Sequence, residues 1–251
     1  MLVLDNIDVT LGKGTKLERP ILKELNLKVD TGDFVVVIGS NGSGKSTMLK
    51  VISGLIKPDK GRVLINRQDM TCMPQIQRSA LVSSVMQDPR VGTIENMTIF
   101  ENMAFAFKRG QGRGLYPFYS ASRRQFFKDK LSVLNMGLEE RMDETVGNLS
   151  GGQRQALSLI MALLVDSKIL LLDEVNAALD PGMSQMIMEL MHKVITDQQR
   201  TCIMITHNMG HAIAYGNRLV LLKNGNFQRE YSAAEKERMT QASLSAHFEE
   251  I

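Results

Sequence analysis

A glycine-rich segment placed directly after an apolar run constrains this chain more than any other feature. The run from Phe34 to Ile38 predicts a buried strand, and the following segment GSNGSGKST leads into a helix that begins near Lys45. Glycine lets the backbone approach a ligand closely and adopt conformations that a Cβ atom would oppose. The exposed N–H groups of such a turn, with the unpaired donors of the helix start, form a nest for anions. The segment therefore predicts a site for a polyphosphate.

The same segment carries side chains suited to a nucleoside triphosphate. Its spacing is that of a P-loop, and the required context of strand, loop and helix is present. Lys45 can reach the β- and γ-phosphates, and the hydroxyl of Ser46 can bind Mg²⁺. The predicted nucleotide-binding residues of the P-loop are Gly39, Ser40, Asn41, Gly42, Ser43, Gly44, Lys45, Ser46 and Thr47. A chance glycine-rich loop is the alternative, and the complete pattern in its context argues against it.

Composition narrows the class of protein. With 251 residues, 43% of them hydrophobic, the chain can form one large α/β domain or a core with an inserted subdomain. Its net charge of +3 gives no sign of a nucleic-acid-coating surface, so we expect no direct nucleic-acid partner. Cys72 and Cys202 lack further ligands at metal-binding spacing and read as free thiols of a reducing compartment. The sequence shows no signal peptide and no apolar stretch of about 18 residues, so membrane association is expected to come through a partner.

Strands alternate with helices along most of the chain, which predicts a doubly wound parallel sheet. Residues 2–10 and 21–29 alternate apolar and polar side chains, as the strands of an antiparallel pair do. Residues 62–70 and 81–87 read as one further strand each. The predicted fold class is α/β, with an antiparallel β subdomain attached to the core.

A helical segment interrupts this pattern. Between residues 88 and 147, phenylalanine and methionine recur at helical spacing, which predicts a helical subdomain inserted into a core formed by residues 1–87 and 148–251. The basic, glycine-containing loop at residues 108–124 reads as a solvated connector, with contact to phosphate or lipid head groups as the alternative.

A second glycine motif, NLSGGQ, opens the next helix. Ser150 is suited to cap that helix, and Gly151 and Gly152 leave its first N–H groups uncovered. Together with Gln153, these residues predict a second anion site in the same chain.

Polar residues follow several predicted strands. A predicted strand ends just before each of the P-loop, Gln87, Glu174 and His207. Ligands of doubly wound sheets bind outside the carboxyl ends of the strands. We therefore expect one crevice to gather these residues.

Their chemistry fits transfer of a phosphoryl group to water. Asp173 closes an apolar strand, where a lone carboxylate is costly unless it faces a cation, so we expect it to hold Mg²⁺ indirectly while Ser46 binds the ion. Glu174 can serve as general base for the attacking water, with a surface glutamate as the alternative. His207 can donate to the γ-phosphate and fix the water, or it can be a core histidine. Gln87 can reach the metal or the water, or it can simply open a loop.

These motifs together resemble those of ATP-binding cassette (ABC) ATPases. GSNGSGKST, Gln87, LSGGQ, LLLDE, AALD and His207 occur in that family's order and approximate spacing, over essentially the whole chain. The resemblance implies a RecA-like core with the helical subdomain, and two subunits packed head to tail. Each ATP would then lie between the P-loop of one subunit and Ser150, Gly151, Gly152 and Gln153 of the other. Asp180, in the segment after the two acids, would communicate across the dimer.

The resemblance also implies partners. A single cassette is similar to the separate ATPase subunit of a bacterial transporter, which sits at the cytoplasmic face of the cell membrane. It would dock on an integral membrane permease through the helical subdomain and the region near Gln87. LSGGQRQALSL with AALDP most resembles an importer subgroup with a branched-chain-amino-acid-like permease and an extracytoplasmic solute-binding lipoprotein, which makes the cargo a small solute such as an amino acid.

Two other classes of protein are alternatives to a transporter subunit. A soluble, non-transport ABC ATPase, linked to Fe–S assembly or to nucleic acid, is the main alternative. A simple P-loop kinase or GTPase is a third class, and LSGGQ argues against it. The chain also departs from the family at the end of the first strand, where Leu11 stands in place of an aromatic residue that stacks on adenine. The contact to the base, and with it the preference for ATP over GTP, stays open.

Overall fold

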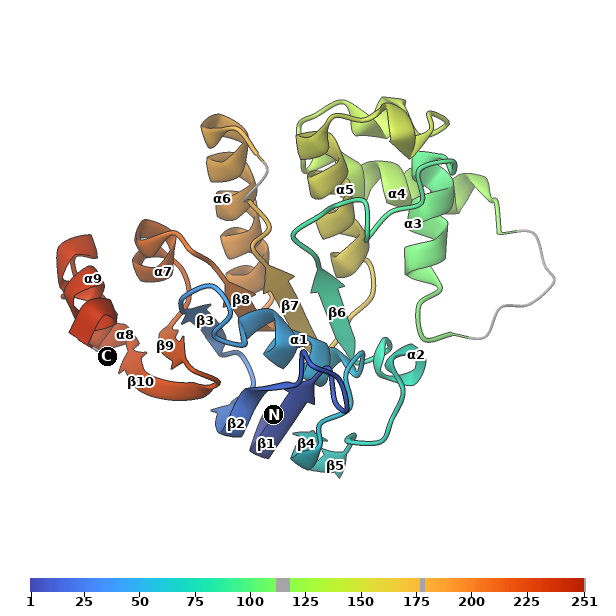
Figure 1. Ribbon diagram of the computed structural model, residues 1–251. Helices are drawn as coiled ribbons and strands as arrows, with labels where there is room; N and C mark the ends of the chain where they lie inside the picture. The colour runs from blue at the N-terminus through green and yellow to red at the C-terminus, as the bar shows by residue number, and fades with distance from the viewer. Residues whose placement is uncertain (112–117, 177–178, 251) are drawn as a thin grey trace. The chain divides into compact units, whose positions relative to one another are not determined.

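The computed structural model describes residues 1–111, 118–176 and 179–250 (Figure 1). They form two compact units, Met1–Arg78 with Ile195–Ile251 and Ser79–Val194. Each unit contains strands and helices of its own.

An antiparallel sheet occupies the N-terminal part of the first unit. Its strands, in the spatial order β2–β1–β4–β5, are β2 (Arg19–Val29), β1 (Leu2–Leu11), β4 (Lys60–Ile65) and β5 (Gln68–Asp69). The predicted antiparallel pair is confirmed, with Leu2 beside Val29. The single strand predicted for residues 62–70 is wrong, because Asn66 and Arg67 have φ of 52° and 65° and turn the chain back on itself. Two residues at positive φ are the signature of a tight hairpin turn.

The first unit also holds a mainly parallel set of strands, in the order β10–β9–β3–β8. These are β10 (Asn226–Ser232), β9 (Arg218–Lys223), β3 (Phe34–Ile38) and β8 (Thr201–Ile205). β3 pairs in parallel with both β8 and β9, and all five of its residues are buried, as predicted. The Asn-Gly pair at residues 224–225 predicts a hairpin-type turn, and this turn joins β9 to β10.

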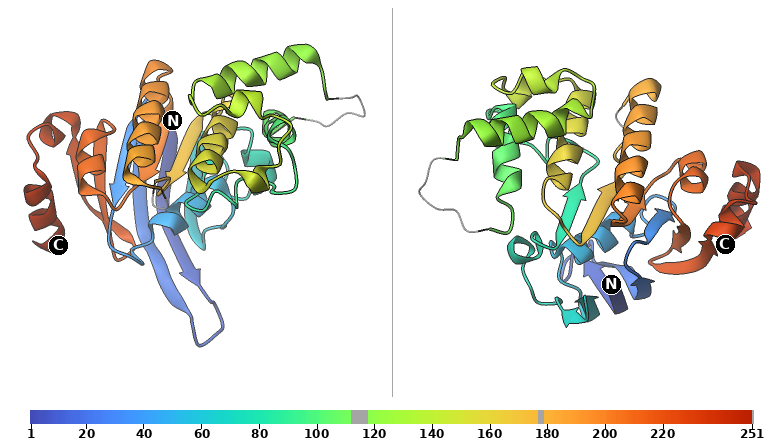
Figure 2. Two further views of the ribbon diagram at one scale, coloured as in Figure 1. Left: turned by 90° about the horizontal axis from the view of Figure 1, so that it is seen from above. Right: turned by 180° about the vertical axis from the view of Figure 1, so that it is seen from behind.

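Helices accompany these strands. The helices that lie wholly in the first unit are α1 (Lys45–Ser53), α2 (Gln75–Arg78), α7 (Met209–Ala214), α8 (Ala233–Lys236) and α9 (Gln241–Glu250). The spacing of Ser232 and Glu235 predicts a capping box, and this box opens α8. The last helix, α9, lies beside α7 (Figures 1 and 2).

Arg78 anchors the far end of the helix that follows the P-loop. Its side chain is 1% exposed, and its guanidinium donates to the carbonyls of Val51 (2.8 Å) and Ile52 (3.1 Å) in the last turn of α1. It also donates to the carbonyls of Met70 and Met73. A cation is favourable at a helix C-terminus, where the last carbonyls lack partners within the helix. Arg78 therefore fixes α1 against the segment between β5 and α2.

The second unit contains two parallel strands and a group of helices. The strands are β6 (Val82–Val85) and β7 (Ile169–Asp173). The helices are α3 (Ile99–Phe107), α4 (Ala121–Ser132), α5 (Gly151–Leu163) and α6 (Pro181–Asp197), with short 3-10 turns η1 (Leu138–Glu140) and η2 (Val146–Asn148). In Figure 2, α3, α4 and α5 lie together. The ring of Phe127 in α4 contacts the rings of Phe100 and Phe107 in α3.

The helical character predicted after residue 88 is confirmed by α3 and α4. The boundaries of an inserted subdomain at residues 88 and 147 stay a prediction. Residues 112–117, within the basic loop, lie outside the described part of the chain, so the interpretation of that loop also stays a prediction. Among the described residues, no helix combines the length and the hydropathy needed to cross a membrane.

Candidate nucleotide-binding and catalytic site

The P-loop connects β3 to α1, in the predicted order of strand, loop and helix. It leaves β3 at Gly39 and enters α1 at Lys45. Between them the chain turns, and the N–H of Ser43 donates to the carbonyl of Ser40 at 3.2 Å. Gly42 and Gly44 have φ of 79° and 107°, which glycine adopts without the steric penalty of a side chain.

Close packing at Gly39 explains the first glycine of the loop. A Cβ atom there would lie 2.3 Å from the carbonyl oxygen of Leu222 and 2.7 Å from Oγ of Ser43. No side chain can be accommodated at those distances without a shift of the backbone. The glycine at position 39 is therefore required by packing rather than by its φ.

Polar groups inside the loop fit a phosphate ligand. The Lys45 side chain is 5% exposed and folds back, so that Nζ donates to the carbonyls of Gly39 (2.8 Å) and Ser40 (3.0 Å). Oγ of Ser43 is buried and has no hydrogen-bond partner among the described residues. The ammonium held against the loop and the unsatisfied hydroxyl of the same loop are donors that phosphate oxygens can use. Asn41 and Gly42 are exposed, while Ser46 and Thr47 are half-buried at the start of α1.

His207 leaves the same edge of the sheet as the P-loop. Val37 of β3 lies beside Ile205 of β8 in a parallel ladder, so the carboxyl ends of both strands meet at that edge. His207 is exposed, and the next residue, Asn208, caps α7 by accepting from the N–H of His211 (3.0 Å). The alternative of a buried core histidine is therefore wrong.

In the second unit, Gln87 and the two acids share one edge. β6 and β7 are parallel, with Val85 beside Leu172, so Gln87 and Glu174 follow neighbouring strand ends. Gln87 is exposed and Asp173 is half-buried at the last position of β7.

Glu174 is distinguished by its backbone as well as its burial. It is 9% exposed and has φ of 47°, in the left-handed region. Holding a residue that has a Cβ there costs about 1 kcal/mol or more, and such strain concentrates at functional sites. The alternative of a surface glutamate is wrong, because the residue is buried. The left-handed φ of Glu174 cannot be recognised from the residue types in the sequence.

The signature segment, residues 149–153, begins α5 as predicted. Oγ of Ser150 accepts from the N–H of Gln153, and Oε1 of Gln153 accepts from the N–H of Ser150, both at 3.2 Å. This reciprocal capping box fixes the first turn. Gly151 is exposed, whereas a Cβ on Gly152 would lie 2.9 Å from Cγ of Met183. The first turn of α5 therefore presents amide groups at the protein surface, next to a glycine that close packing requires.

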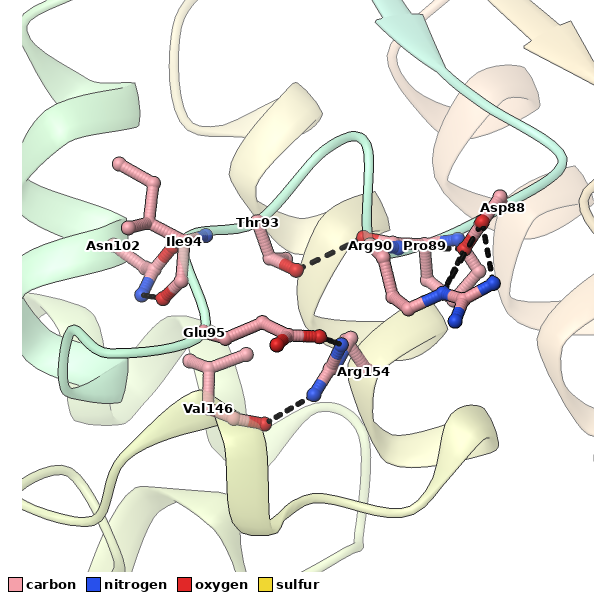
Figure 3. A network of polar contacts seen from close by, with 9 residues as sticks. All are labelled: Asp88, Pro89, Arg90, Thr93, Ile94, Glu95, Asn102, Val146 and Arg154. Carbon is pink, nitrogen blue, oxygen red and sulfur yellow. Dashed lines mark hydrogen bonds and ion pairs between the residues drawn. The ribbon is translucent and has the colours of Figure 1, made fainter.

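An ion pair ties the signature helix to the segment after Gln87 (Figure 3). Arg154 Nη1 donates to Oε1 of Glu95 at 2.7 Å, and Nη2 donates to the Val146 carbonyl at 3.1 Å. The Arg154 side chain is 8% exposed and that of Glu95 is 55% exposed. No local sequence pattern predicts this contact, because the two residues lie far apart along the chain.

Two amide side chains fix the same segment. Asn102 of α3 accepts from the Ile94 N–H (2.8 Å) and donates to the Ile94 carbonyl (3.0 Å), as Figure 3 shows. Gln155 of α5 donates to the Met86 carbonyl at 3.3 Å, one residue before Gln87. The segment from Gln87 to Glu95 is therefore held by both α3 and α5.

Charges within that segment pair locally. The Arg90 guanidinium donates to both carboxylate oxygens of Asp88 (Figure 3). These hydrogen bonds hold the pKa of Asp88 below its usual range. Asp88 is therefore ionised at neutral pH.

Asp180 caps α6. Its Oδ1 accepts from the N–H of Met183 at 3.0 Å, and the residue is exposed. Residues 177–178 of the AALD motif lie outside the described part of the chain. Leu11 ends β1 and is 39% exposed, so it presents an aliphatic surface where the family resemblance implies an aromatic one.

The predicted site residues thus fall into two groups. The P-loop and His207 lie in the first unit, and Gln87, Asp173, Glu174, the signature segment and Asp180 lie in the second. Their assembly into one site stays a prediction. Among the described residues, no three His, Cys, Asp or Glu side chains gather as a metal centre. Mg²⁺ is commonly held by one or two protein groups plus substrate phosphates, so the Ser46 hydroxyl and the Asp173 carboxylate are donors of the right kind.

Known proteins are similar to this chain in sequence. A family model described as ABC transporter matches residues 22–177. The chain is 37% identical over 249 residues to a "Tyrosine transport ATP-binding protein" of Clostridioides difficile, with 99% of each protein covered. It is 34% identical over 200 residues to the "Thiamine import ATP-binding protein ThiQ" of Yersinia pseudotuberculosis, with 80% of each covered.

A solved structure agrees with the fold. The chain is similar to the ATP-binding cassette MJ0796, described as a dimer in a post-hydrolysis state bound to ADP and Pi. The TM-score is 0.80 at 30% identity, over 93% of this chain and 99% of that one. The predicted α/β fold with a P-loop NTPase core is confirmed. By its P-loop, its signature segment and these matches, the chain belongs to the ABC transporter family and is one of its ATP-binding cassette ATPases.

Proposed function

We propose that two copies of this chain pair head to tail, hydrolyse ATP between them and drive import of a small solute through a separate permease. The start of α5 is the observation that carries this proposal. The capping box fixes its first turn, and the N–H groups of Gly151 and Gly152 are left there as donors suited to phosphate, although the chain has its P-loop elsewhere. A second phosphate-binding surface has a use when it completes the pocket of another copy.

Within such a paired site, each residue has a defined task. Lys45 and the P-loop amides hold the β- and γ-phosphates, and bound Mg²⁺ would neutralise charge on these oxygens while held by Ser46 and Asp173. Glu174 accepts a proton from the water whose oxygen attacks the γ-phosphorus, as ADP leaves. His207 and Gln87 orient that water. Asp180 connects the two copies.

The surface near Gln87 supports a membrane partner. Val91, Ile94 and Phe105 are 69%, 41% and 44% exposed, on the segment and helix held by the Figure 3 network. Exposed apolar side chains of this kind mark interaction surfaces. We assign them to short cytoplasmic helices of an integral membrane permease. The chain would then act on the inner face of the cell membrane, with an extracytoplasmic solute-binding lipoprotein delivering the cargo.

The names of the relatives support import and an amino-acid-like or similarly small cargo. One is named for tyrosine transport and another for thiamine import. A soluble, non-transport ABC ATPase is not favoured by these relatives.

Capture of the permease tests the transport role. A tagged chain, co-expressed with the permease gene adjacent to its own, should retain an integral membrane protein after detergent solubilisation. Val91→Glu places a charge in the proposed interface and should lose that protein. Ile76→Glu is the matched control, since Ile76 is 83% exposed on α2 of the first unit. If Val91→Glu and Ile76→Glu retained the membrane protein equally, the proposed surface would be contradicted. If the wild-type chain captured no membrane protein, the transport role would be contradicted.

Trapping the pair tests hydrolysis. Glu174→Gln removes the general base while keeping the size of the side chain, so turnover should stop and an ATP-bound dimer should accumulate. Size-exclusion chromatography with ATP, against ADP as control, measures that dimer. Normal turnover by this variant would exclude the base role of Glu174.

A further inference from the structure

The turn between β9 and β10 is buried at its tip. Asn224 and Gly225 form the turn, with φ of 53° and 83°. Gly225 is buried, although Asn224 and Asn226 on either side of it are exposed. Connecting turns ordinarily run over the protein surface. This turn therefore makes a contact that an ordinary hairpin tip does not.

The P-loop is one partner of the turn, and β2 is the other. The N–H of Gly225 donates to the carbonyl of Ser43 at 3.0 Å. The carbonyl of Gly225 accepts from the N–H of Lys23, also at 3.0 Å. A Cβ at position 225 would lie 2.2 Å from the carbonyl oxygen of Ile21, so only glycine fits between the two segments.

The bond to Ser43 sets the direction of a neighbouring donor. The carbonyl of Ser43 and the N–H of Gly44 belong to one peptide unit, which is planar and trans, so they point in opposite directions. Gly44 is the N-cap of α1, and among the described residues its N–H has no hydrogen-bond acceptor. When Gly225 holds the carbonyl on one side, the Gly44 N–H is fixed on the other.

We propose that the Asn224–Gly225 turn positions the P-loop, by holding the Ser43 carbonyl so that the Gly44 N–H faces the phosphate of the nucleotide. Gly225 is then a positioning residue for nucleotide binding, although it lies far along the chain from the P-loop. Gly44 supports the same arrangement, since a Cβ there would lie 2.6 Å from Cδ2 of Leu22. Residues 21–23 of β2 thus pack against both the turn and the P-loop. This inference rests on nucleotide binding at the P-loop.

Two alanine variants separate this role from backbone strain. Gly225→Ala meets the Ile21 carbonyl and displaces the turn. Gly137→Ala is the matched control, because Gly137 has φ of 69° and an added Cβ there meets nothing within 4 Å. Both variants place alanine at a positive φ and carry a similar strain from that φ. Of the two glycines, Gly225 is the one that has a hydrogen bond to the P-loop.

Titration calorimetry of the full chain with ADP measures the effect. Gly225→Ala should weaken ADP binding by about tenfold or more, the loss of one hydrogen bond to a charged group. Gly137→Ala should stay within about twofold of the wild type, since its strain acts on folding rather than on the site. Equal affinities of Gly225→Ala and the wild type, or equal weakening in both variants, would overturn the positioning role alone. Failure of the wild type to bind ADP would overturn the nucleotide site as well.

Amide exchange tests the same bond without a substitution. In the wild-type chain, ADP should slow hydrogen exchange at the Gly225 amide, because a nucleotide that orders the P-loop also holds the Ser43 carbonyl that this amide bonds. Nuclear magnetic resonance of the full chain resolves this amide. An exchange rate that ADP leaves unchanged would overturn the proposal even if Gly225→Ala failed to fold.

Discussion

Lys236 gives the stability of this chain a defined dependence on pH. The residue is 3% exposed at the end of α8, and its ammonium donates to the carbonyls of Tyr215 and Gly216. Burial lowers the pKa of Lys236 from 10.5 to about 8. Below pH 8 both the folded and the unfolded chain carry the proton, and desolvation of the ammonium opposes folding in full. Above pH 8 the folded chain loses the proton first, so the free energy of unfolding rises with pH up to 10.5.

The size of the effect follows from the shift in pKa. Each pKa unit corresponds to 1.36 kcal/mol, so raising the pH from about 7.5 to about 9.5 should add about 2 kcal/mol to the free energy of unfolding. Lys236→Met has a similar length and no titratable group. Subtracting its free energy of unfolding from that of the wild type at each pH isolates the contribution of Lys236.

Urea unfolding at several pH values measures this difference. The carbonyls of Tyr215 and Gly216 stabilise the charged ammonium and act to raise the pKa of Lys236, whereas burial lowers it. The pH dependence of this difference measures the net shift of that pKa. A difference between wild type and Lys236→Met that stays constant within about 0.5 kcal/mol from pH 7.5 to 9.5 would refute the reasoning.

Two further substitutions test contacts that hold the functional segments. Arg78→Met should lower the free energy of unfolding by about 3 kcal/mol, since it removes the hydrogen bonds that the guanidinium donates to the carbonyls of Val51, Ile52 and Met70; urea unfolding measures the loss, and a change below about 1 kcal/mol would contradict the anchoring role. Glu95→Ala should lower it by only about 1 kcal/mol, because the Glu95 side chain is half exposed and solvent screens the ion pair with Arg154. The same unfolding assay checks this value, and a loss as large as that of Arg78→Met would show that the screening argument is wrong.

The sequence predicted the P-loop and the signature segment well because their glycines and caps act locally. The positive φ of Gly42 and Gly44 and the capping by Ser150 affect only the residues next to them in the chain. The spacing of these residues alone therefore indicates the turn or the helix start. The same holds for the Asn-Gly turn at residues 224–225, whose residue types favour positive φ.

Features that depend on distant contacts were not predictable in this way. Arg78 stands in the polar stretch QIQR and reads as an exposed residue, yet carbonyls of α1 gather around it. The turn at Asn66 and Arg67 contains no glycine, so the pattern predicts one strand where the structure has two. The left-handed backbone of Glu174 is imposed by its surroundings, and no local residue type encodes it.

Complementation between two inactive variants tests the central claim, that each ATP is hydrolysed between two copies of the chain. Lys45→Ala disables the P-loop and Ser150→Arg blocks the signature segment, so each variant alone should be inactive. A mixed pair contains one intact site, formed by the P-loop of the Ser150→Arg chain and the signature segment of the Lys45→Ala chain. Mixing equal amounts should therefore restore ATPase activity, up to about a quarter of the wild-type rate if pairing is random and the two sites act independently. A mixture that stays as inactive as its two components would contradict the account.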